Sequence, residues 1–186
     1  MYTGKLVLLR SFDAADLNAL CRFLNDPATM RLLTDGAVMP ATMEDTARWM
    51  QDQTWPSGGV YQFALEALED GQFIGRCGFV QIDRKNRHGE IAIHLGDPAR
   101  RGRGLGSDAI RVLCRLGFQE LGLHRIWARC FSYNPACARS LEKCGFRPEG
   151  TFREALFRDG QWHDIHTWAI LEEEWRRLSV PPPETP

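Results

Sequence analysis

The sequence predicts a mixed α/β fold, in which helices flank a mostly antiparallel sheet. Several predicted strands follow one another without a helix between them, which favours antiparallel pairing, and one strand–helix–strand unit in the middle of the chain favours a parallel pair. Of the 186 residues, 44% are hydrophobic and 25% are charged, as is typical of a folded globular chain. We therefore expect one domain over residues 1–178 and a disordered, proline-rich tail over residues 179–186.

The first part of the chain predicts one strand followed by two helices. Residues 5–10 are predicted to form the strand. Residues 13–25 carry apolar side chains at helical spacing and predict a helix that Pro27 ends. A capping-box spacing at residues 42–45 opens a second helix, which we expect to reach about Trp55, before a turn rich in proline and glycine.

The middle of the chain predicts three strands and the longest helix. Residues 60–68 and 73–82 are predicted strands, joined by a Glu-Asp-Gly turn that is a hairpin signal. A very apolar strand follows over residues 88–95. The longest helical pattern then extends over residues 103–121.

The last part of the chain predicts a strand, a helix and a hairpin. Residues 124–131 predict the strand, and residues 135–144 predict the helix, which has proline at its favoured first position and ends at Gly145. Two final strands, over residues 152–158 and 162–171, flank an Asp-Gly turn.

Charge and composition exclude several classes of partner. The 23 basic and 24 acidic residues give a net charge of −1, so there is no overall basic field and we expect no nucleic-acid partner. No apolar run approaches the roughly 20 residues of a membrane-spanning helix, and the start of the chain has no apolar stretch of signal-peptide length. We therefore expect a cytoplasmic protein with no membrane partner.

The cysteines and histidines do not have the spacing of a metal site. None of the six cysteines forms a CxxC pair, and we expect them to be reduced and mostly buried. His163 and His166 are three residues apart in a predicted strand, where they point to opposite faces. We therefore expect no metal ion.

The segment over residues 90–107 carries the clearest chemical signal. It combines a strand, a loop with three arginines and three glycines, and the start of a helix. Glycines let a ligand approach the backbone, and the free N–H groups at a helix start bind anions, so a diphosphate is the natural ligand. A P-loop is excluded because no Gly-Lys-Ser/Thr follows, and a dinucleotide site is disfavoured because the pattern is GxGxG. The alternative is a surface turn with solvated arginines.

Three segments resemble the GNAT superfamily of N-acetyltransferases. Residues 101–106, Arg-Gly-Arg-Gly-Leu-Gly, match its Arg/Gln-x-x-Gly-x-Gly/Ala loop for acetyl-CoA, and residues 134–146 resemble its Asn…Glu-Lys-x-Gly-Phe segment. Residues 150–162, followed by Asp164, are similar to the closing hairpin of the branch that acetylates the amino termini of ribosomal proteins. Residues 6–10 fit the same branch, so the resemblance covers nearly all of the chain.

The resemblance implies the GNAT acyl-CoA N-acyltransferase fold, with acetyl-CoA as co-substrate. In the family, the loop amides hold the diphosphate, the preceding strand pairs with the pantetheine arm through its backbone, and one amide there polarises the thioester carbonyl. The cofactor-binding residues that it implies here are His94, Leu95, Gly96, Arg101, Gly102, Arg103, Gly104, Leu105, Gly106, Ser107 and Asn134.

The implied reaction is direct attack of a neutral amine on the thioester. Glu90 stands at the strand start where many relatives keep a base, although a solvated strand end is an equal alternative. His88 and His94 are the other candidate bases. Asn134 is expected near the pantetheine and the reacting amine, but before Pro135 it is also an ordinary helix N-cap.

The proton donor for the leaving thiolate cannot be carried over from the family. Many relatives have a tyrosine immediately before the Glu-Lys pair, and this chain has Leu141 there. Cys137, one helical turn earlier on the same face, and Ser140 are the nearby candidates. We expect solvent to supply the proton instead.

The favoured acceptor is the α-amine of a protein amino terminus. A small amine, such as a polyamine or an aminoglycoside, and a non-catalytic acyl-CoA sensor are the alternatives. We expect the first two helices and the final hairpin to build the acceptor pocket, with Trp49, Trp55 and Trp162 as candidate wall residues, although such tryptophans more often belong to a core. A homodimer is left open.

Overall fold

The computed structural model describes residues 1–53 and 59–179. Its strands are β1 (Tyr2–Thr3), β2 (Val7–Arg10), β3 (Tyr61–Ala67), β4 (Phe73–Asp83), β5 (His88–Leu95), β6 (Arg125–Phe131), β7 (Arg147–Arg158) and β8 (Gln161–Leu171). Its helices are α1 (Leu17–Leu24), α2 (Pro27–Met30), α3 (Met43–Asp52), α4 (Leu105–Arg115), α5 (Pro135–Glu142) and α6 (Glu172–Ser179). Short helical turns at Ala14–Asp16, Pro98–Arg100 and Leu116–Glu120 complete the described elements.

One eight-stranded sheet organises these elements, in the order β1-β2-β3-β4-β5-β6-β8-β7. All neighbours are antiparallel except β5 and β6, which are the two strands joined through α4. This confirms the predicted mixed, mostly antiparallel fold. No helix within the described ranges is long and apolar enough to cross a membrane.

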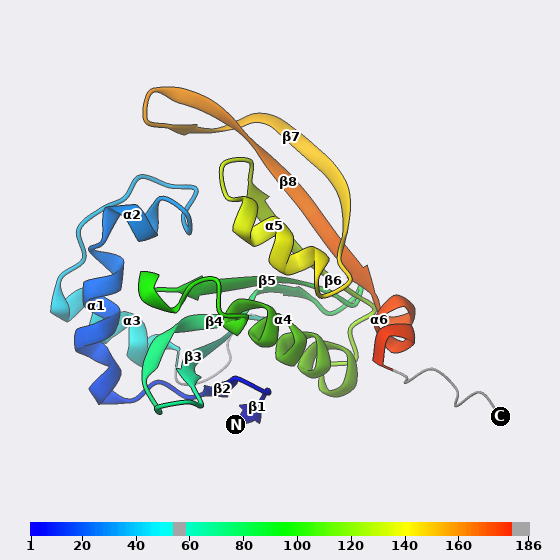
Figure 1. Ribbon diagram of the computed structural model, residues 1–186, viewed down its shortest axis with the longest axis horizontal. Coiled ribbons are helices and arrows are strands. Elements are labelled where there is room, and N and C mark those ends of the chain that lie inside the picture. Colours follow the sequence, from blue (N-terminus) through cyan, green and yellow to red (C-terminus); the bar gives the residue numbers. More distant parts are fainter. Residues whose placement is uncertain (54–58, 180–186) are drawn as a thin grey trace.

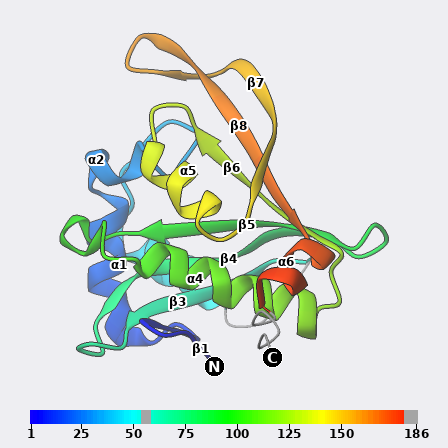
Figure 2. The same ribbon diagram turned by 45° about the vertical axis from the view of Figure 1, so that its right-hand side comes forward.

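The parallel pair β5–β6 is short, and this shapes the molecule. Only three register pairs join the two strands, the last of them between Glu90 and Trp127. Beyond that pair β6 continues against β8, and β5 continues against β4. Figure 2 shows the resulting divergence of β5 from β6, with the β7–β8 hairpin projecting beyond them, also seen in Figure 1. The sheet is therefore split along β5 beyond Glu90.

The helices cover both faces of the sheet. On one face α4 and the turn after it pack closely, since a side chain at Gly117 would meet Phe79 and Ile126. On the other face, α1 and α3 contribute Phe23, which lies against Gly96, and Trp49, which lies on Arg76. Because side chains alternate along a strand, these two faces can be followed from residue to residue.

The structure corrects several predicted boundaries. Pro27 ends α1 as expected, but it also opens α2, because Asp26 caps this helix and proline suits the first helical position. The predicted helix over residues 103–121 begins two residues later, at Leu105. Strand β1 and helix α6 were not predicted. The predicted helix end at Trp55, the turn up to residue 58 and the tail from residue 180 lie outside the described residues.

The last hairpin contains a bulge that the sequence did not reveal. Strand β7 begins five residues before the predicted strand, and its register against β8 shifts between Phe152 and Leu156. Within the bulge, Glu154 has a φ of 52°, a left-handed conformation that is uncommon outside glycine. Its N–H donates to Oδ1 of Asp164 at 2.8 Å. Asp164 therefore stabilises the bend that directs the tip of the hairpin.

Candidate functional site

The loop between β5 and α4 has the backbone of an anion-binding site. Gly102 and Gly104 have φ values of 75° and 84°, which only glycine adopts without strain. A Cβ atom at Gly102 would meet nothing within 4 Å, and one at Gly106 would meet only the Leu95 side chain, at 3.6 Å. The N–H groups of the first turn of α4 have no partner within the helix and carry its positive dipole end. The loop therefore fits the diphosphate of coenzyme A.

The arginines of this loop contact protein groups. Arg103 donates to Glu69 at 2.7 Å, and Arg100 pairs with Asp70 in the same β3–β4 turn. Arg101 donates to the carbonyl of Leu95 at 3.1 Å. These contacts link the loop to the β3–β4 turn and to β5.

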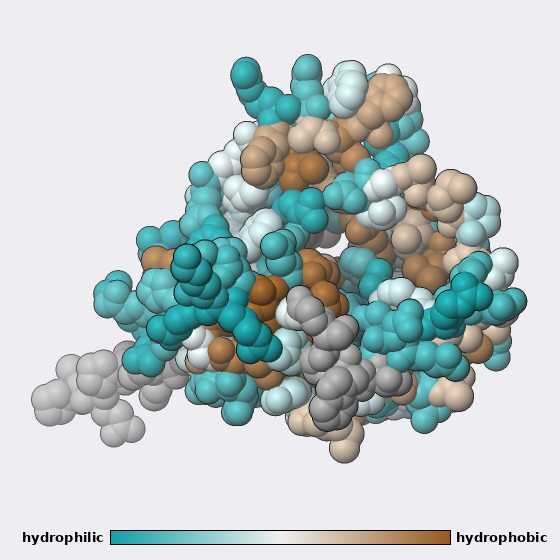
Figure 3. Space-filling view, turned by 180° about the vertical axis from the view of Figure 1, so that it is seen from behind, coloured by the Kyte–Doolittle hydropathy of each residue, from teal (hydrophilic) through white to brown (hydrophobic). Residues whose placement is uncertain are grey.

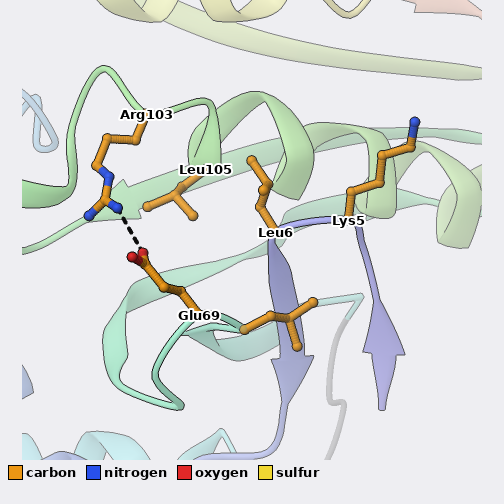
Figure 4. Close-up of a pocket in the computed structure, with 6 residues that line it drawn as sticks. Lys5, Leu6, Glu69, Arg103 and Leu105 are labelled. Carbon is orange, nitrogen blue, oxygen red and sulfur yellow. Dashed lines mark hydrogen bonds and ion pairs between the residues drawn. The ribbon is translucent and has the colours of Figure 1, made fainter.

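A pocket of about 320 Å³ lies beside the loop, lined by Lys5, Leu6, Leu68, Glu69, Arg103 and Leu105. Figure 4 shows the Arg103–Glu69 ion pair across one side of this pocket, and the Lys5 ammonium group pointing away from it. The carboxylate of Glu69 would repel a diphosphate. The pocket borders the loop at Arg103 and Leu105.

The edge of β5 beyond the split exposes backbone groups. The N–H of Gly96 donates to Ile74 of β4 at 2.9 Å. In an antiparallel ladder, hydrogen-bonded pairs alternate with non-bonded ones, so the polar groups of Leu95 and Ile93 face away from β4, toward the split. Of the three strand residues in the predicted cofactor site, Leu95 is thus the one whose backbone borders the split, and Ile93 is a second residue that the sequence did not identify.

Glu90 lies at the point where β5 and β6 separate, and it is paired. Its side chain is buried, with 6% exposure, and it accepts a hydrogen bond from Nε of Arg129 at 2.7 Å. Arg129 also binds Asp35, at 3.0 Å, in the segment between α2 and α3. The predicted alternative of a solvated strand end is therefore wrong, because Glu90 is enclosed in a carboxylate–guanidinium–carboxylate chain.

The two candidate histidines occupy opposite ends of β5. They are six residues apart on an extended strand, which separates them by about 20 Å. His94 borders the cofactor loop, and burial, with a further contribution from Arg76, lowers its pKa well below the usual histidine value. His88 lies 3.7 Å from Asp83 at the other end. Only His94 is placed near the loop, and it is neutral at physiological pH.

Helix α5 carries the remaining predicted residues. Oδ1 of Asn134 accepts from the N–H of Cys137 at 3.2 Å, so Asn134 is the N-cap of this helix. A hydrogen bond with Cys130 and burial raise the pKa of the Cys137 thiol well above its usual range. Ser140 donates to Ala136 within its own helix, and Leu141 is buried in the core. The candidate donors are thus a protonated thiol and a hydroxyl already bonded to the backbone.

The segment after α2 and the tip of the β7–β8 hairpin meet over the split. Arg31 pairs with Asp159, and Arg158 donates to the carbonyls of Thr34 and Gly36, at 2.8 and 2.9 Å. The hydroxyl of Tyr133 donates to the carbonyl of Arg31 at 2.7 Å. Figure 3 shows an opening through the molecule, at the place that corresponds in Figure 1 to the space between α5, the end of β5 and the segment after α2.

The candidate wall tryptophans have different environments. Trp49, in α3, is partly buried and contacts Phe12 and Arg76. Trp162 is 61% exposed on the outer hairpin, where it contacts Phe157. Trp55 lies outside the described residues. Trp49 is therefore the candidate that the structure places beside other residues of the site.

The sequence did not identify three charged residues on this face: Asp35, Arg76 and Arg129. A signal was present for the two arginines, because each interrupts an otherwise apolar strand, where an unpaired charge is costly. Asp35 carries no such signal, since acidic residues are ordinary in loops. Within the described residues, no group of three or more potential metal ligands comes together.

Comparison with known proteins identifies the family. The family model described as "Acetyltransferase (GNAT) domain" matches residues 7–147. An uncharacterized N-acetyltransferase of Bacillus subtilis, YnaD, is 28% identical over 93% of this chain and 98% of its own length. The crystal structure of a GNAT-family acetyltransferase from Bacillus anthracis is 27% identical, with a TM-score of 0.79 over 92% of this chain and 98% of that one.

Two further relatives have names that state an acceptor. The [ribosomal protein uS5]-alanine N-acetyltransferase of Escherichia coli is 28% identical over 63% of this chain and 61% of its own length. The spermidine N(1)-acetyltransferase of Vibrio cholerae is 29% identical over 60% of this chain and 65% of its own length. The family match, the sheet split at β5 and the glycine loop agree, and this chain belongs to the GNAT family of N-acetyltransferases.

Proposed function

We propose that this enzyme transfers the acetyl group of acetyl-CoA to the α-amine of a protein amino terminus, by direct attack of the neutral amine. The observation that carries this proposal is the pairing of Glu90 and Asp35 with Arg129. Both carboxylates are bound to the same guanidinium, so the three groups together carry one net negative charge, which suits a single α-ammonium group better than several cationic groups. A polyamine carries several cationic groups and needs unpaired carboxylates, whereas a single α-amine does not.

The α-amine also suits the base that the structure offers. Our candidate base is Glu90, which accepts a hydrogen bond from Nε of Arg129. An α-amine with a pKa of about 7.7–8.0 is roughly one-tenth to one-sixth neutral at pH 7, so it needs little help with deprotonation. A lysine-like amine, with a pKa of about 10.4, has a neutral fraction at pH 7 that is several hundred times smaller, so it would depend far more on a base.

The cofactor supplies an activated thioester, and residues of this chain hold it. The amides of Leu105, Gly106 and Ser107 are placed to bind the diphosphate, with Gly102 and Gly104 shaping the loop. The free edge at Ile93 and Leu95 offers the amide that would polarise the thioester carbonyl. Asn134 borders the same space, and the proton for the leaving thiol comes from solvent, with Cys137 as the alternative donor. The six free thiols fit the cytoplasmic location that the sequence suggests.

The ribosomal-protein relative supports a protein amino terminus, and the spermidine relative supports the alternative of a small amine. A test compares short peptides beginning with serine or alanine with spermidine and an aminoglycoside, and it measures release of free thiol from acetyl-CoA. We expect saturable turnover with the peptides, and a kcat/KM at least tenfold above that of spermidine. The reverse order would replace the peptide with a small amine, and no turnover with any amine would leave an acyl-CoA sensor.

A further inference from the structure

We propose that Arg76 binds a carboxylate of the acceptor, so that the acetylated amine belongs to a molecule that also carries a carboxylate close by. This inference rests on the proposed function, because it concerns the acceptor of the same acetyl transfer. The carboxylate has two sources, the acidic side chain of a residue near a peptide amino terminus and the α-carboxylate of a free amino acid. We favour the first.

Strand register places Arg76 on the acceptor face of the sheet. Arg76 of β4 lies directly opposite His94 of β5, about 5 Å away between strands. Paired residues share a face, and side chains alternate along β5, so Glu90 and His94 point to that same face. The face is the one covered by α1 and α3, opposite to α4. Arg76 is therefore one strand away from the edge where the sheet splits.

The guanidinium of Arg76 has no carboxylate partner among residues 1–53 and 59–179. Its one hydrogen bond is a long contact of 3.5 Å to Gln62, and its other contact is the ring of Trp49, at 4.7 Å from the ring centroid. Two other arginines of the sheet differ. Arg10 is bound by two carboxylates, and so is Arg129.

Arg76 remains charged although it is largely buried. Burial lowers its pKa to about 10, which still leaves the guanidinium protonated at neutral pH. A buried charge is costly unless a counter-ion or hydrogen bonds compensate it. A carboxylate of a ligand would compensate the charge of this guanidinium.

The polar edge of Arg76 is not completely enclosed. Within the described residues, the fully buried side-chain nitrogens and oxygens that lack a partner are Nε of Arg158 and Nε1 of Trp168, and no nitrogen of Arg76 is among them. The Trp49 ring contacts the guanidinium through its π-face, and a carboxylate is the partner that arginine binds through two parallel hydrogen bonds.

The test uses two pairs of acceptors that differ only in a carboxylate. The first pair is Ser-Glu-Ala amide and Ser-Gln-Ala amide, and the second is alanine and alaninamide. Thiol release gives kcat/KM for each acceptor with the wild-type enzyme. We expect a preference of at least tenfold for the carboxylate in one pair, the lower end of the range for a hydrogen bond between charged groups. The pair that shows it identifies the source of the carboxylate.

Variants at Arg76 show whether this residue is responsible. Arg76→Met removes the charge, and Arg76→Lys keeps it without the two parallel donors. Arg84→Met is the matched control, because Arg84 lies in the exposed turn after β4 and contacts Tyr61 there. We expect Arg76→Met to reduce the preference to below threefold, whereas Arg84→Met keeps the preference of the wild-type enzyme. Alanine and alaninamide differ in the basicity of their amines. Dividing the preference of the wild-type enzyme by that of Arg76→Met cancels this difference.

Each outcome decides between the two proposals. Turnover of the amide acceptors without a carboxylate preference in either pair would overturn the role of Arg76 and leave the proposed function intact. A preference that survives in Arg76→Met would also overturn it. If no acceptor releases thiol, the proposed function itself fails. Should Arg76→Met not fold, as judged by thermal unfolding, the wild-type ratio of the peptide pair and the ratios of Arg76→Lys still decide.

Discussion

The cofactor loop and the acceptor face of the sheet differ in how many chain segments build them. The loop is formed by seven consecutive residues, 101–107, and its binding groups are backbone amides. The acceptor face combines side chains from four segments, with Asp35 after α2, Arg76 in β4, Glu90 in β5 and Arg129 in β6. A contiguous site depends on local backbone conformation, whereas the face depends on the register of the sheet.

The difference also concerns what a substitution changes. In the loop, the residues either are glycines or direct their side chains to protein partners, such as Glu69. A mutation there therefore acts by changing the backbone conformation or by blocking the approach of a ligand to it. On the face, the working groups are charges that compensate one another, so a mutation acts through an unbalanced charge. The following experiments test this contrast from the largest expected effect to the smallest.

The largest effect is expected from Gly106→Val. A side chain at this position would meet only Leu95 at 3.6 Å, so the fold should tolerate it while the diphosphate loses its close approach to the backbone. We expect the acetyl-CoA-dependent rise in Tm to disappear and kcat/KM to fall by at least about 100-fold. Gly150→Val is the control, since it also has ordinary space and lies in β7, away from the loop. An unchanged thermal shift in Gly106→Val would remove the loop from the site.

Glu90→Gln is expected to have the next largest effect. If Glu90 removes the proton of an α-amine, kcat should fall by about tenfold at pH 7 and less at pH 9, where most of that amine is already neutral. The loss of a hydrogen bond to a charged group should also lower the free energy of unfolding by about 1.5–3 kcal/mol. Asp35→Asn removes the other partner of Arg129 and is the control. An equal loss of kcat at both pH values would assign Glu90 to positioning.

The lowered pKa of His94 predicts a pH-dependent stability. The unfolded chain binds a proton on this residue below about pH 6.5, whereas the folded chain, with its lowered pKa, does not. The stability contributed by the neutral ring is therefore complete above pH 6.5 and is lost as the pH falls, with a slope approaching about 1.4 kcal/mol per pH unit. Urea unfolding of wild type and His94→Gln between pH 5 and 8 measures it. Parallel curves for the two proteins would contradict the assignment.

The smallest effects are expected from Cys137→Ala and Ser140→Ala. The Cys137 thiol is hydrogen-bonded to Cys130, and the Ser140 hydroxyl donates to the carbonyl of Ala136, so both protons are already engaged within the protein. We expect kcat to fall by less than tenfold in each variant, since solvent supplies the proton. General-acid catalysis contributes about 10²–10⁴-fold, so a loss of that size in one variant would identify the donor.

Local signals were sufficient for much of the fold. The hairpin turns at residues 69–71 and 159–160, the glycine loop and helix α5 with its proline start all depend on neighbouring residues, and the structure has them. Helix α2 was missed because Pro27 can end one helix and start another. The bulge in β7 was missed because its stability comes from Asp164, ten residues away on the opposite strand.

The sequence by itself determined the family, the glycine-rich loop before α4 and the position of Glu90 at the start of β5. Only the tertiary structure decided that Glu90 is buried and paired, and that Arg76 has no carboxylate partner in the described part of the chain. The physical reason is the distance along the chain over which each property is set. A positive φ at glycine is a property of one residue, but the balance of charge around Arg76 and Arg129 depends on which strands lie side by side and where two of them separate.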